Sequence, residues 1–190
     1  RPGVTRVAVV GAGSWGTALS AILSKKGHDV FLWAFEPEVA EQITRLRENV
    51  SYLPGIALPE NLRSTADLVT AVQGAGIIVS VSPAQVVGVV MAEAARHIQD
   101  DALVISASKG LELTTLRRMD EVLAEVLSPE QFDGFTVLSG PSFALEVAQQ
   151  VPTAVVAASE RADAALAVQD LFQTANFRVY TGDDVIGVEL

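Results

Sequence analysis

The sequence predicts an α/β fold of the doubly wound type, in which a mainly parallel β-sheet carries helices on both faces. Short apolar runs that suit strands alternate with stretches of helical apolar periodicity along almost the whole chain. A glycine-rich loop, Gly11-Ala-Gly-Ser-Trp-Gly16, joins the first apolar run to the first helical stretch. The sequence contains no repeat, low-complexity tract or flexible linker that would divide this pattern.

The first two elements flank the glycine loop. A strand is expected at residues 7–10, where an apolar run leads into the loop. The helix after the loop is expected to bury one apolar face. The residues of that face are Trp15, Ala18, Leu19, Ile22 and Leu23. Lys25 and Lys26 suit the last turn of this helix, and Gly27 suits its end.

The other elements follow in alternation. Further strands are expected at residues 29–34, 76–81, 102–106, 135–138, 153–158 and 177–180. Further helices are expected from Pro37, at residues 67–72, after Pro83, at residues 114–127 and at residues 162–172. Their expected inward-facing residues are Val39, Ile43 and Leu46; Val86, Val87, Val90, Met91 and Ala94; and Leu116, Met119, Val122, Leu123 and Val126. Residues 49–61 are expected to be irregular.

The spacing of Gly11, Gly13 and Gly16 between a strand and a helix is that of a dinucleotide-binding fingerprint. Gly11 allows the tight turn, Gly13 leaves the backbone open to a pyrophosphate, and Gly16 lets the helix pack closely on the strand. The N–H groups and the dipole at the helix start attract the anion. Glu36 follows the second strand, where an acid bonds the adenosine ribose hydroxyls in this fold.

Two alternatives to a cofactor loop exist. The first is a glycine-rich turn without a ligand. The second is a secretory signal peptide, because Arg1 and Arg6 precede an apolar stretch, but glycines interrupt that stretch and a strand follows where cleavage would occur. We therefore expect residues 1–182 to form a Rossmann-like NAD(P)-binding domain. Residues 183–190, opened by Asp183 and Asp184, are expected to begin another helix.

The composition limits the function classes. The 190 residues are 49% hydrophobic and 19% charged, which suits one substantial globular domain. A net charge of −10 without a Lys/Arg cluster argues against nucleic acid and membranes as partners. With no cysteine and two histidines, neither a disulfide framework nor a metal site is expected, and the cytoplasm is the expected compartment.

Ligands of open α/β sheets bind beyond the carboxyl ends of the strands. The loops that meet this rule are residues 11–16, 82–83, 108–110 and 139–142. Lys109 is the only cation in them. It can attract a phosphate or polarise a carbonyl group, or it is a solvated surface lysine. The 139–142 loop can bind an anion or be an ordinary turn and N-cap. Trp15 and Phe35 either line the nucleotide or belong to the core.

Longer segments, in order along the chain, carry a family pattern. They are Gly11-Ala-Gly-Ser-Trp-Gly-Thr-Ala-Leu19, Tyr52-Leu-Pro-Gly-Ile56 with Leu58-Pro-Glu-Asn61, Ser106-Ala-Ser-Lys-Gly-Leu-Glu112, Leu138-Ser-Gly-Pro-Ser-Phe-Ala-Leu-Glu-Val147, Pro152-Thr-Ala-Val155 and Val179-Tyr-Thr-Gly-Asp-Asp-Val-Ile-Gly-Val-Glu-Leu190. Together they resemble the NAD(P)-dependent glycerol-3-phosphate dehydrogenases. The resemblance implies hydride transfer between the nicotinamide and C2 of dihydroxyacetone phosphate or sn-glycerol 3-phosphate, a reaction that feeds glycerophospholipid synthesis.

The resemblance also implies roles for individual residues. Lys109 becomes the candidate catalytic residue, in contact with both cofactor and substrate. The expected cofactor-binding residues are Gly11, Gly13, Ser14, Trp15, Gly16, Phe35, Glu36, Pro83, Lys109 and Ala144. The expected substrate-binding residues are Lys109, Gly140 and Ser142. In this family an acid/base lysine follows in a Gly-Ala-Leu-Lys-Asn run and an all-helical domain completes the site. The 190 residues alone are therefore expected to be inactive, and the full-length enzyme is expected to be a homodimer.

Two departures from the family pattern bear on these expectations. Many relatives have an arginine or histidine where this chain has Ala34-Phe35-Glu36. An arginine suits the 2′-phosphate of NADP and a carboxylate repels it, so NAD(H) is the favoured cofactor. Relatives often read Val-Pro-Ser-Gln-x-x-Arg where this chain has Ser82-Pro83-Ala84-Gln85-Val86-Val87-Gly88, so the contact of that arginine is lost.

Two other functions stay open at this point. One is a two-domain dehydrogenase of the 6-phosphogluconate or hydroxy-acid type, against which the Leu-Ser-Gly-Pro-Ser-Phe-Ala segment argues. The other is a non-catalytic NAD(H)-binding sensor module, which the sequence keeps open because it lacks the family's acid/base lysine.

Overall fold

The strands join into one sheet in the computed structural model, which describes residues 5–140 and 143–189. They are β1 (Arg6–Val10), β2 (Asp29–Trp33), β3 (Arg63–Thr65), β4 (Ile77–Ser80), β5 (Leu103–Ser106), β6 (Thr136–Ser139), β7 (Thr153–Ser159) and β8 (Phe177–Gly182). Their order is β3-β2-β1-β4-β5-β6-β7-β8. Neighbouring strands are parallel except β6 and β7, which are antiparallel. The mainly parallel sheet expected from the sequence is confirmed.

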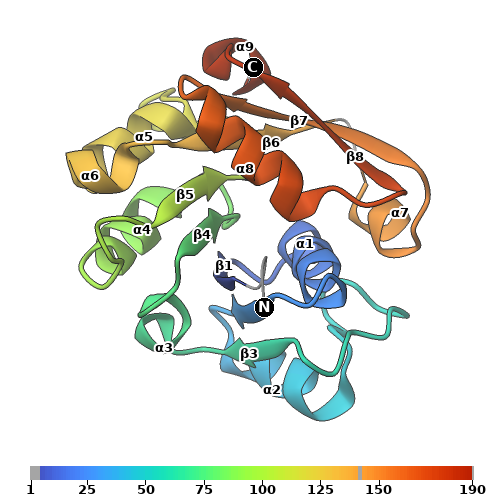
Figure 1. Ribbon diagram of the computed structural model, residues 1–190. Coiled ribbons are helices and arrows are strands. Elements are labelled where there is room, and N and C mark those ends of the chain that lie inside the picture. The colour runs from blue at the N-terminus through green and yellow to red at the C-terminus, as the bar shows by residue number, and fades with distance from the viewer. Residues whose placement is uncertain (1–4, 141–142, 190) are drawn as a thin grey trace.

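Helices cover both faces of this sheet. They are α1 (Ser14–Lys25), α2 (Pro37–Leu46), α3 (Leu68–Val72), α4 (Val87–Ala95), α5 (Met119–Val126), α6 (Pro129–Phe132), α7 (Ala144–Ala148), α8 (Ala162–Phe172) and α9 (Val185–Glu189). One apolar cluster lies under α1, α2, α7 and α8, and a second lies under α3, α4 and α5. Figure 1 shows α3, α4 and α5 on the left of the sheet and α1 and α7 on the right. The doubly wound arrangement is therefore also confirmed.

The interior strand β1 is buried on both faces. Val7 and Val9 belong to one apolar cluster, while Ala8 and Val10 belong to the other, and all four have no exposed surface. Fully burying a valine side chain is worth about 1.5–3 kcal/mol, so this short apolar run contributes to both cores at once. The alternation of side chains along a strand explains why consecutive residues join opposite clusters.

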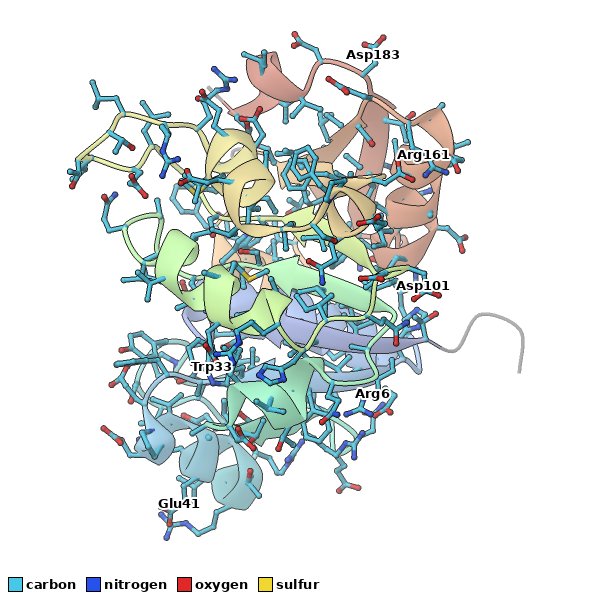
Figure 2. The ribbon with its side chains drawn as sticks, turned by 90° about the vertical axis from the view of Figure 1, so that its left-hand side faces the viewer. Arg6, Trp33, Glu41, Asp101, Arg161 and Asp183 are labelled. Carbon is cyan, nitrogen blue, oxygen red and sulfur yellow. The ribbon has the colours of Figure 1, made fainter. Side chains whose placement is uncertain are left out.

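The carboxyl ends of the parallel strands meet at one edge of the sheet. In Figure 2, Arg6 and Asp101, near the starts of β1 and β5, lie to the right, and Trp33 at the end of β2 lies to the left. The chain passes from β1 to β2 on one side and places β4 on the other side. The strand order therefore reverses at β1, which is where open α/β sheets bind their ligands.

The helix expected at residues 114–127 is wrong over its first turn. The structure begins α5 at Met119. Leu116, expected inside, is 68% exposed and has φ +57°, in a loop closed by a bridge between Glu112 and Arg117. The backbone N–H of Arg118 donates to the Glu121 carboxylate at 3.1 Å, and this cap fixes the helix start.

Other differences are smaller. Leu46 and Val86 were expected to face inward, but they are 52% and 43% exposed. The edge strand β3 was not expected, because its Arg-Ser-Thr sequence has no apolar alternation. The helix α6, a single turn capped by Ser128, was not expected either. Residues 49–61 are irregular, as expected. Within the described residues, no helix has the length and apolar character needed to span a membrane.

The last described helix, α9, packs against α5 and the sheet. Asp184 accepts a hydrogen bond from the Gly187 N–H at 2.9 Å and so caps α9, as expected. At the other end, the side chain of Glu189 is only 6% exposed. One of its oxygens accepts from the Asp120 N–H at 3.0 Å, and the other lies 3.8 Å from Arg118 Nε. Burial, followed by the hydrogen bond with the Asp120 carboxyl, raises the pKa of Glu189 to about 8.

This buried carboxyl group makes stability depend on pH. The folded protein holds the Glu189 proton up to about pH 8, whereas a glutamate of ordinary pKa releases it near 4.5. Between pH 4.5 and about pH 8 the folded state binds more protons at Glu189 than the unfolded state does. The contribution of Glu189 to the free energy of unfolding therefore falls as the pH rises. The Glu189→Gln variant has an uncharged side chain at this position at every pH. We therefore expect the unfolding midpoint of the variant, relative to wild type, to rise between pH 5 and pH 8. Thermal unfolding followed by circular dichroism measures this difference, and a constant difference contradicts the account.

Candidate functional site

A cavity of about 790 Å³ opens at the carboxyl ends of β1, β2, β4 and β5. This volume is within the range of small-molecule and cofactor sites. Its lining includes every residue expected on the cofactor side: Gly11, Gly13, Ser14, Trp15, Gly16, Phe35, Glu36, Pro83, Lys109 and Ala144. Among the described lining residues, Glu36 and Lys109 are the charged ones. The structure thus brings these residues together around one space, and their roles toward a ligand stay predictions.

The three glycines of the loop meet three different constraints. Gly11 has φ +134°, and a Cβ there would lie 2.8 Å from the Ser82 backbone nitrogen. A Cβ on Gly16 would lie 1.9 Å from the carbonyl oxygen of Gly11, so only glycine lets α1 approach the loop this closely. A Cβ on Gly13 would meet nothing within 4 Å. The space beside Gly13 is open, which fits a bulky anion lying against the backbone.

The start of α1 presents amide groups to this space. Gly13 is the N-cap residue and has no side chain to cap the helix. The first intrahelical bond runs from the Thr17 N–H to the Gly13 carbonyl at 3.0 Å. Among the described residues, the amides of Ser14, Trp15 and Gly16 have no acceptor. Unpaired N–H groups and the helix dipole together favour an anion here, so the residues fit the diphosphate of a dinucleotide.

Glu36 marks one end of the cavity. It follows β2 and is the N-cap residue of α2, where its side chain makes no capping hydrogen bond. Its carboxylate instead accepts a hydrogen bond from the Tyr52 hydroxyl. That hydrogen bond raises the pKa of Tyr52, so the hydroxyl keeps its proton and remains a donor. Beside it, Phe35 is 78% exposed, which assigns this ring to the cavity rather than the core.

Lys109 marks the other end. It follows β5, and its side chain is exposed to solvent. Its Nζ donates to the Gly140 carbonyl at 3.1 Å and lies 5.6 Å from the centroid of the Trp15 ring. The strands β2 and β5 are three strand spacings apart, or about 14 Å. The acid and the lysine are therefore separated along a cavity that can hold an elongated ligand.

Trp15 both packs against the core and lines the cavity. Its ring packs against the apolar cluster and lies 6.4 Å, centroid to centroid, from Phe177. It also lines the cavity. Its Nε1 is buried and has no hydrogen-bond partner among the described residues. A buried indole donor usually finds a hydrogen-bond partner, so this unpaired Nε1 is unusual.

The residues expected on the substrate side are only partly described. Gly140 is placed against β7, because a Cβ there would lie 2.9 Å from the Ala154 carbonyl oxygen. This packing explains the glycine without a ligand, while its own carbonyl holds Lys109. Ser142 lies outside the described residues. At the Gly88 position, where the family resemblance led us to expect an arginine in relatives, an added Cβ would lie 3.8 Å from Glu112 Oε2, and Arg117 pairs with that carboxylate at 3.5 Å.

Further residues line the cavity that were not expected there from the sequence. Tyr52 and Ser108 line the cavity, as do the exposed apolar residues Val89 and Phe143. Ser108 fastens two loops together, because its hydroxyl donates to the Ser82 carbonyl at 2.5 Å. The sequence held one indication of Tyr52, which begins the Tyr52-Leu-Pro-Gly-Ile56 segment of the family pattern. Among the described residues, no group of three or more His, Cys, Asp or Glu side chains could hold a metal ion.

Comparisons with known proteins agree with this geometry. Residues 6–165 match the model of the NAD-dependent glycerol-3-phosphate dehydrogenase N-terminus family. The chain is similar to glycerol-3-phosphate dehydrogenase [NAD(P)+] of Geobacter sulfurreducens, with 51% identity over 97% of this chain and 55% of the relative. It is also similar to the enzyme of that name from Enterococcus faecalis, with 45% identity over 97% of this chain and 54% of the relative.

A solved structure shows the same similarity. The crystal structure of glycerol-3-phosphate dehydrogenase from Coxiella burnetii superposes with a TM-score of 0.90 at 35% identity, over 99% of this chain and 57% of that one. The chain thus spans about half the length of the relatives it matches. It belongs to the NAD-dependent glycerol-3-phosphate dehydrogenase family and corresponds to the N-terminal part of its members.

Proposed function

We propose that the protein containing this chain interconverts dihydroxyacetone phosphate and sn-glycerol 3-phosphate with a nicotinamide dinucleotide. Residues 1–182 would be its nucleotide-binding domain, and residues 183–190 would begin the helical substrate domain. We further propose that it acts in the cytoplasm as a homodimer and supplies glycerophospholipid synthesis. The observation that carries the proposal is the cavity with the glycine loop in its middle, Glu36 at one end and Lys109 at the other.

Different residues of the cavity would bind different parts of the cofactor. The amides of Ser14 and Trp15 would bind the diphosphate, and Glu36 would accept hydrogen bonds from the adenosine ribose. Phe35, Pro83 and Ala144 line the cavity and would pack against the nucleotide. When bound, the nicotinamide ring gives or takes the hydride at its C4 atom.

Lys109 would act on the substrate. Its ammonium group would attract the phosphate and polarise the C2 carbonyl, because a fixed positive charge stabilises the negative charge that develops on that oxygen. Gly140 and Ser142 would contact the substrate beside it. Because the chain spans about half the length of its relatives, we propose that the family's acid/base lysine lies outside it and that these 190 residues alone do not turn over substrate.

Two glycine variants separate the binding role of the loop from its folding role. Gly13→Ala places a methyl group in open space, so we expect the unfolding midpoint to stay near wild type while dinucleotide binding weakens at least about tenfold, equivalent to 1.4 kcal/mol. Gly16→Ala forces α1 away from Gly11, and we expect it to lower the midpoint as well. Calorimetric titration and thermal unfolding of the full-length protein measure both. A Gly13→Ala protein that binds NADH normally contradicts the proposed anion site.

The role of Lys109 is tested by its removal. We expect Lys109→Ala in the full-length protein to lower kcat by about 100-fold or more, because an electrostatic donor to the reacting oxygen is lost. NADH binding should persist within about threefold, since the glycine loop and Glu36 remain. Lys25→Ala is the matched control, because Lys25 is an exposed lysine at the end of α1 that does not line the cavity. Near-normal turnover of Lys109→Ala would remove this residue from the mechanism.

The reaction and the choice of cofactor are tested together. We expect the full-length protein to reduce dihydroxyacetone phosphate and to use NADH at a lower KM than NADPH, because the Glu36 carboxylate repels a 2′-phosphate. Glu36→Gln removes this repulsion and should narrow the preference by about tenfold or more. Oxidation of NADH and NADPH followed at 340 nm gives both constants. Absence of reduction overturns the proposed reaction, and a lower KM for NADPH overturns the proposed preference alone.

A further inference from the structure

A short turn at residues 49–53 contacts both halves of the proposed cofactor site. The Leu53 N–H donates to the Asn49 carbonyl at 2.9 Å and closes the turn. The Tyr52 N–H donates to Asn49 Oδ1 at 3.1 Å, so the Asn49 side chain also fixes the turn from within. The turn belongs to the irregular segment 49–61, to which the proposed function has assigned no role.

Asn49 connects this turn to the glycine loop. The residue has no exposed surface. Its Nδ2 donates to the Ala12 carbonyl and to Thr17 Oγ1, both at 2.9 Å. Thr17 Oγ1 in turn donates to the Gly13 carbonyl at 2.8 Å. Ala12 and Gly13 line the cavity, whereas Asn49 and Thr17 do not, so side chains outside the cavity hold the carbonyl groups of the loop.

Tyr52 connects the same turn to the ribose end. Its hydroxyl donates to Glu36 Oε1, and Tyr52 itself lines the cavity beside Glu36. The hydrogen bond engages one carboxylate oxygen and leaves Oε2 to accept from a ligand hydroxyl. A carboxylate held by a hydrogen bond loses less side-chain freedom on binding than a free one, which favours affinity.

We propose that Asn49 and Tyr52 are positioning residues, which hold the glycine loop and Glu36 in a fixed relation, and that Tyr52 sets the discrimination between NAD(H) and NADP(H). This inference rests on the proposed cofactor site. A ribose 2′-hydroxyl can donate to Glu36 Oε2, whereas a 2′-phosphate carries a charge of about −1.5 to −2 that the carboxylate repels. If Glu36 were not held by Tyr52, it could turn toward solvent and relieve that repulsion.

Tyr52→Phe tests the specificity role in the full-length protein. We expect NADH binding to weaken about three- to tenfold, while NADPH binding stays the same or tightens, so that the ratio of the two Kd values shrinks. The unfolding midpoint should stay within about 2 °C of wild type, because the Tyr52 hydroxyl is on the surface. Ser51→Ala is the matched control: it removes another hydroxyl of this turn, which bonds Gln42 at 3.3 Å instead of Glu36. Both Kd values should then stay at wild type.

Two further variants separate positioning from general damage. Asn49→Ala removes the buried donor 2.9 Å from the Ala12 carbonyl and leaves it the weaker contact with the Thr17 hydroxyl at 3.5 Å, so we expect a lower unfolding midpoint and a similar loss of affinity for NADH and NADPH, with their ratio kept. In a Glu36→Gln background, Tyr52→Phe should change the Kd ratio by less than about twofold, because the two residues act as one unit.

The outcomes are distinct. A reduced Kd ratio in Tyr52→Phe that vanishes in the Glu36→Gln background supports the inference. An unchanged ratio, an equal loss for both coenzymes, or independent effects of the two substitutions overturns it while leaving the proposed function in place. A wild-type protein that binds neither NADH nor NADPH in calorimetric titration overturns the proposed function, and the inference falls with it.

Discussion

The close packing of Gly16 against the carbonyl of Gly11 is the contact on which the rest of the structure depends. An added Cβ at Gly16 would lie 1.9 Å from that oxygen, so no other residue lets α1 lie this close to the end of β1. The contact directs the amides at the start of α1 over the carboxyl edge of the sheet. It also brings Thr17 to the position where Asn49 bonds it. One steric constraint thereby sets both the position of the unpaired amides at the start of α1 and the anchor of the 49–53 turn.

The order of the strands places charged side chains on both sides of the contact between Gly11 and Gly16. Because β1 lies between β2 and β4, the loops after these strands surround the glycine loop from both sides. Glu36 follows β2 and Lys109 follows β5, so the negative and the positive side chain are at opposite ends of the cavity. Although the chain has a net charge of −10, Lys109 provides a local positive charge at one end of the cavity.

Much of the fold could be predicted because its signals are local. The apolar run at residues 7–10, the spacing of the three glycines and the stop at Gly27 each act within a few residues, and each predicted element formed. Leu116 shows the limit, because its apolar spacing imitates a helix while the cap at Arg118 starts α5 later. An edge strand such as β3 has no apolar alternation of its own, since its place depends on pairing with β2.

Some residues of the site could be predicted from the sequence pattern, and others could not. The glycine loop and the position of Glu36 follow from spacing, whereas the roles of Lys109 and Gly140 rest on the family resemblance. The positioning contacts of Asn49 and Tyr52 could not be predicted from spacing or from the family resemblance. Its hydrogen bonds join Asn49 to Ala12 across 37 positions and Tyr52 to Glu36 across 16, and no periodicity connects residues through an irregular segment.

The most direct measurement of the central claim is a crystal structure of the full-length protein with bound NADH. The account predicts the diphosphate within hydrogen-bond distance of the Ser14 and Trp15 amides, and the adenosine ribose hydroxyls on Glu36 while Tyr52 still donates to it. The nicotinamide ring should lie toward Lys109. A dinucleotide bound elsewhere, or bound in this cavity with its diphosphate away from the glycine loop, would contradict the account.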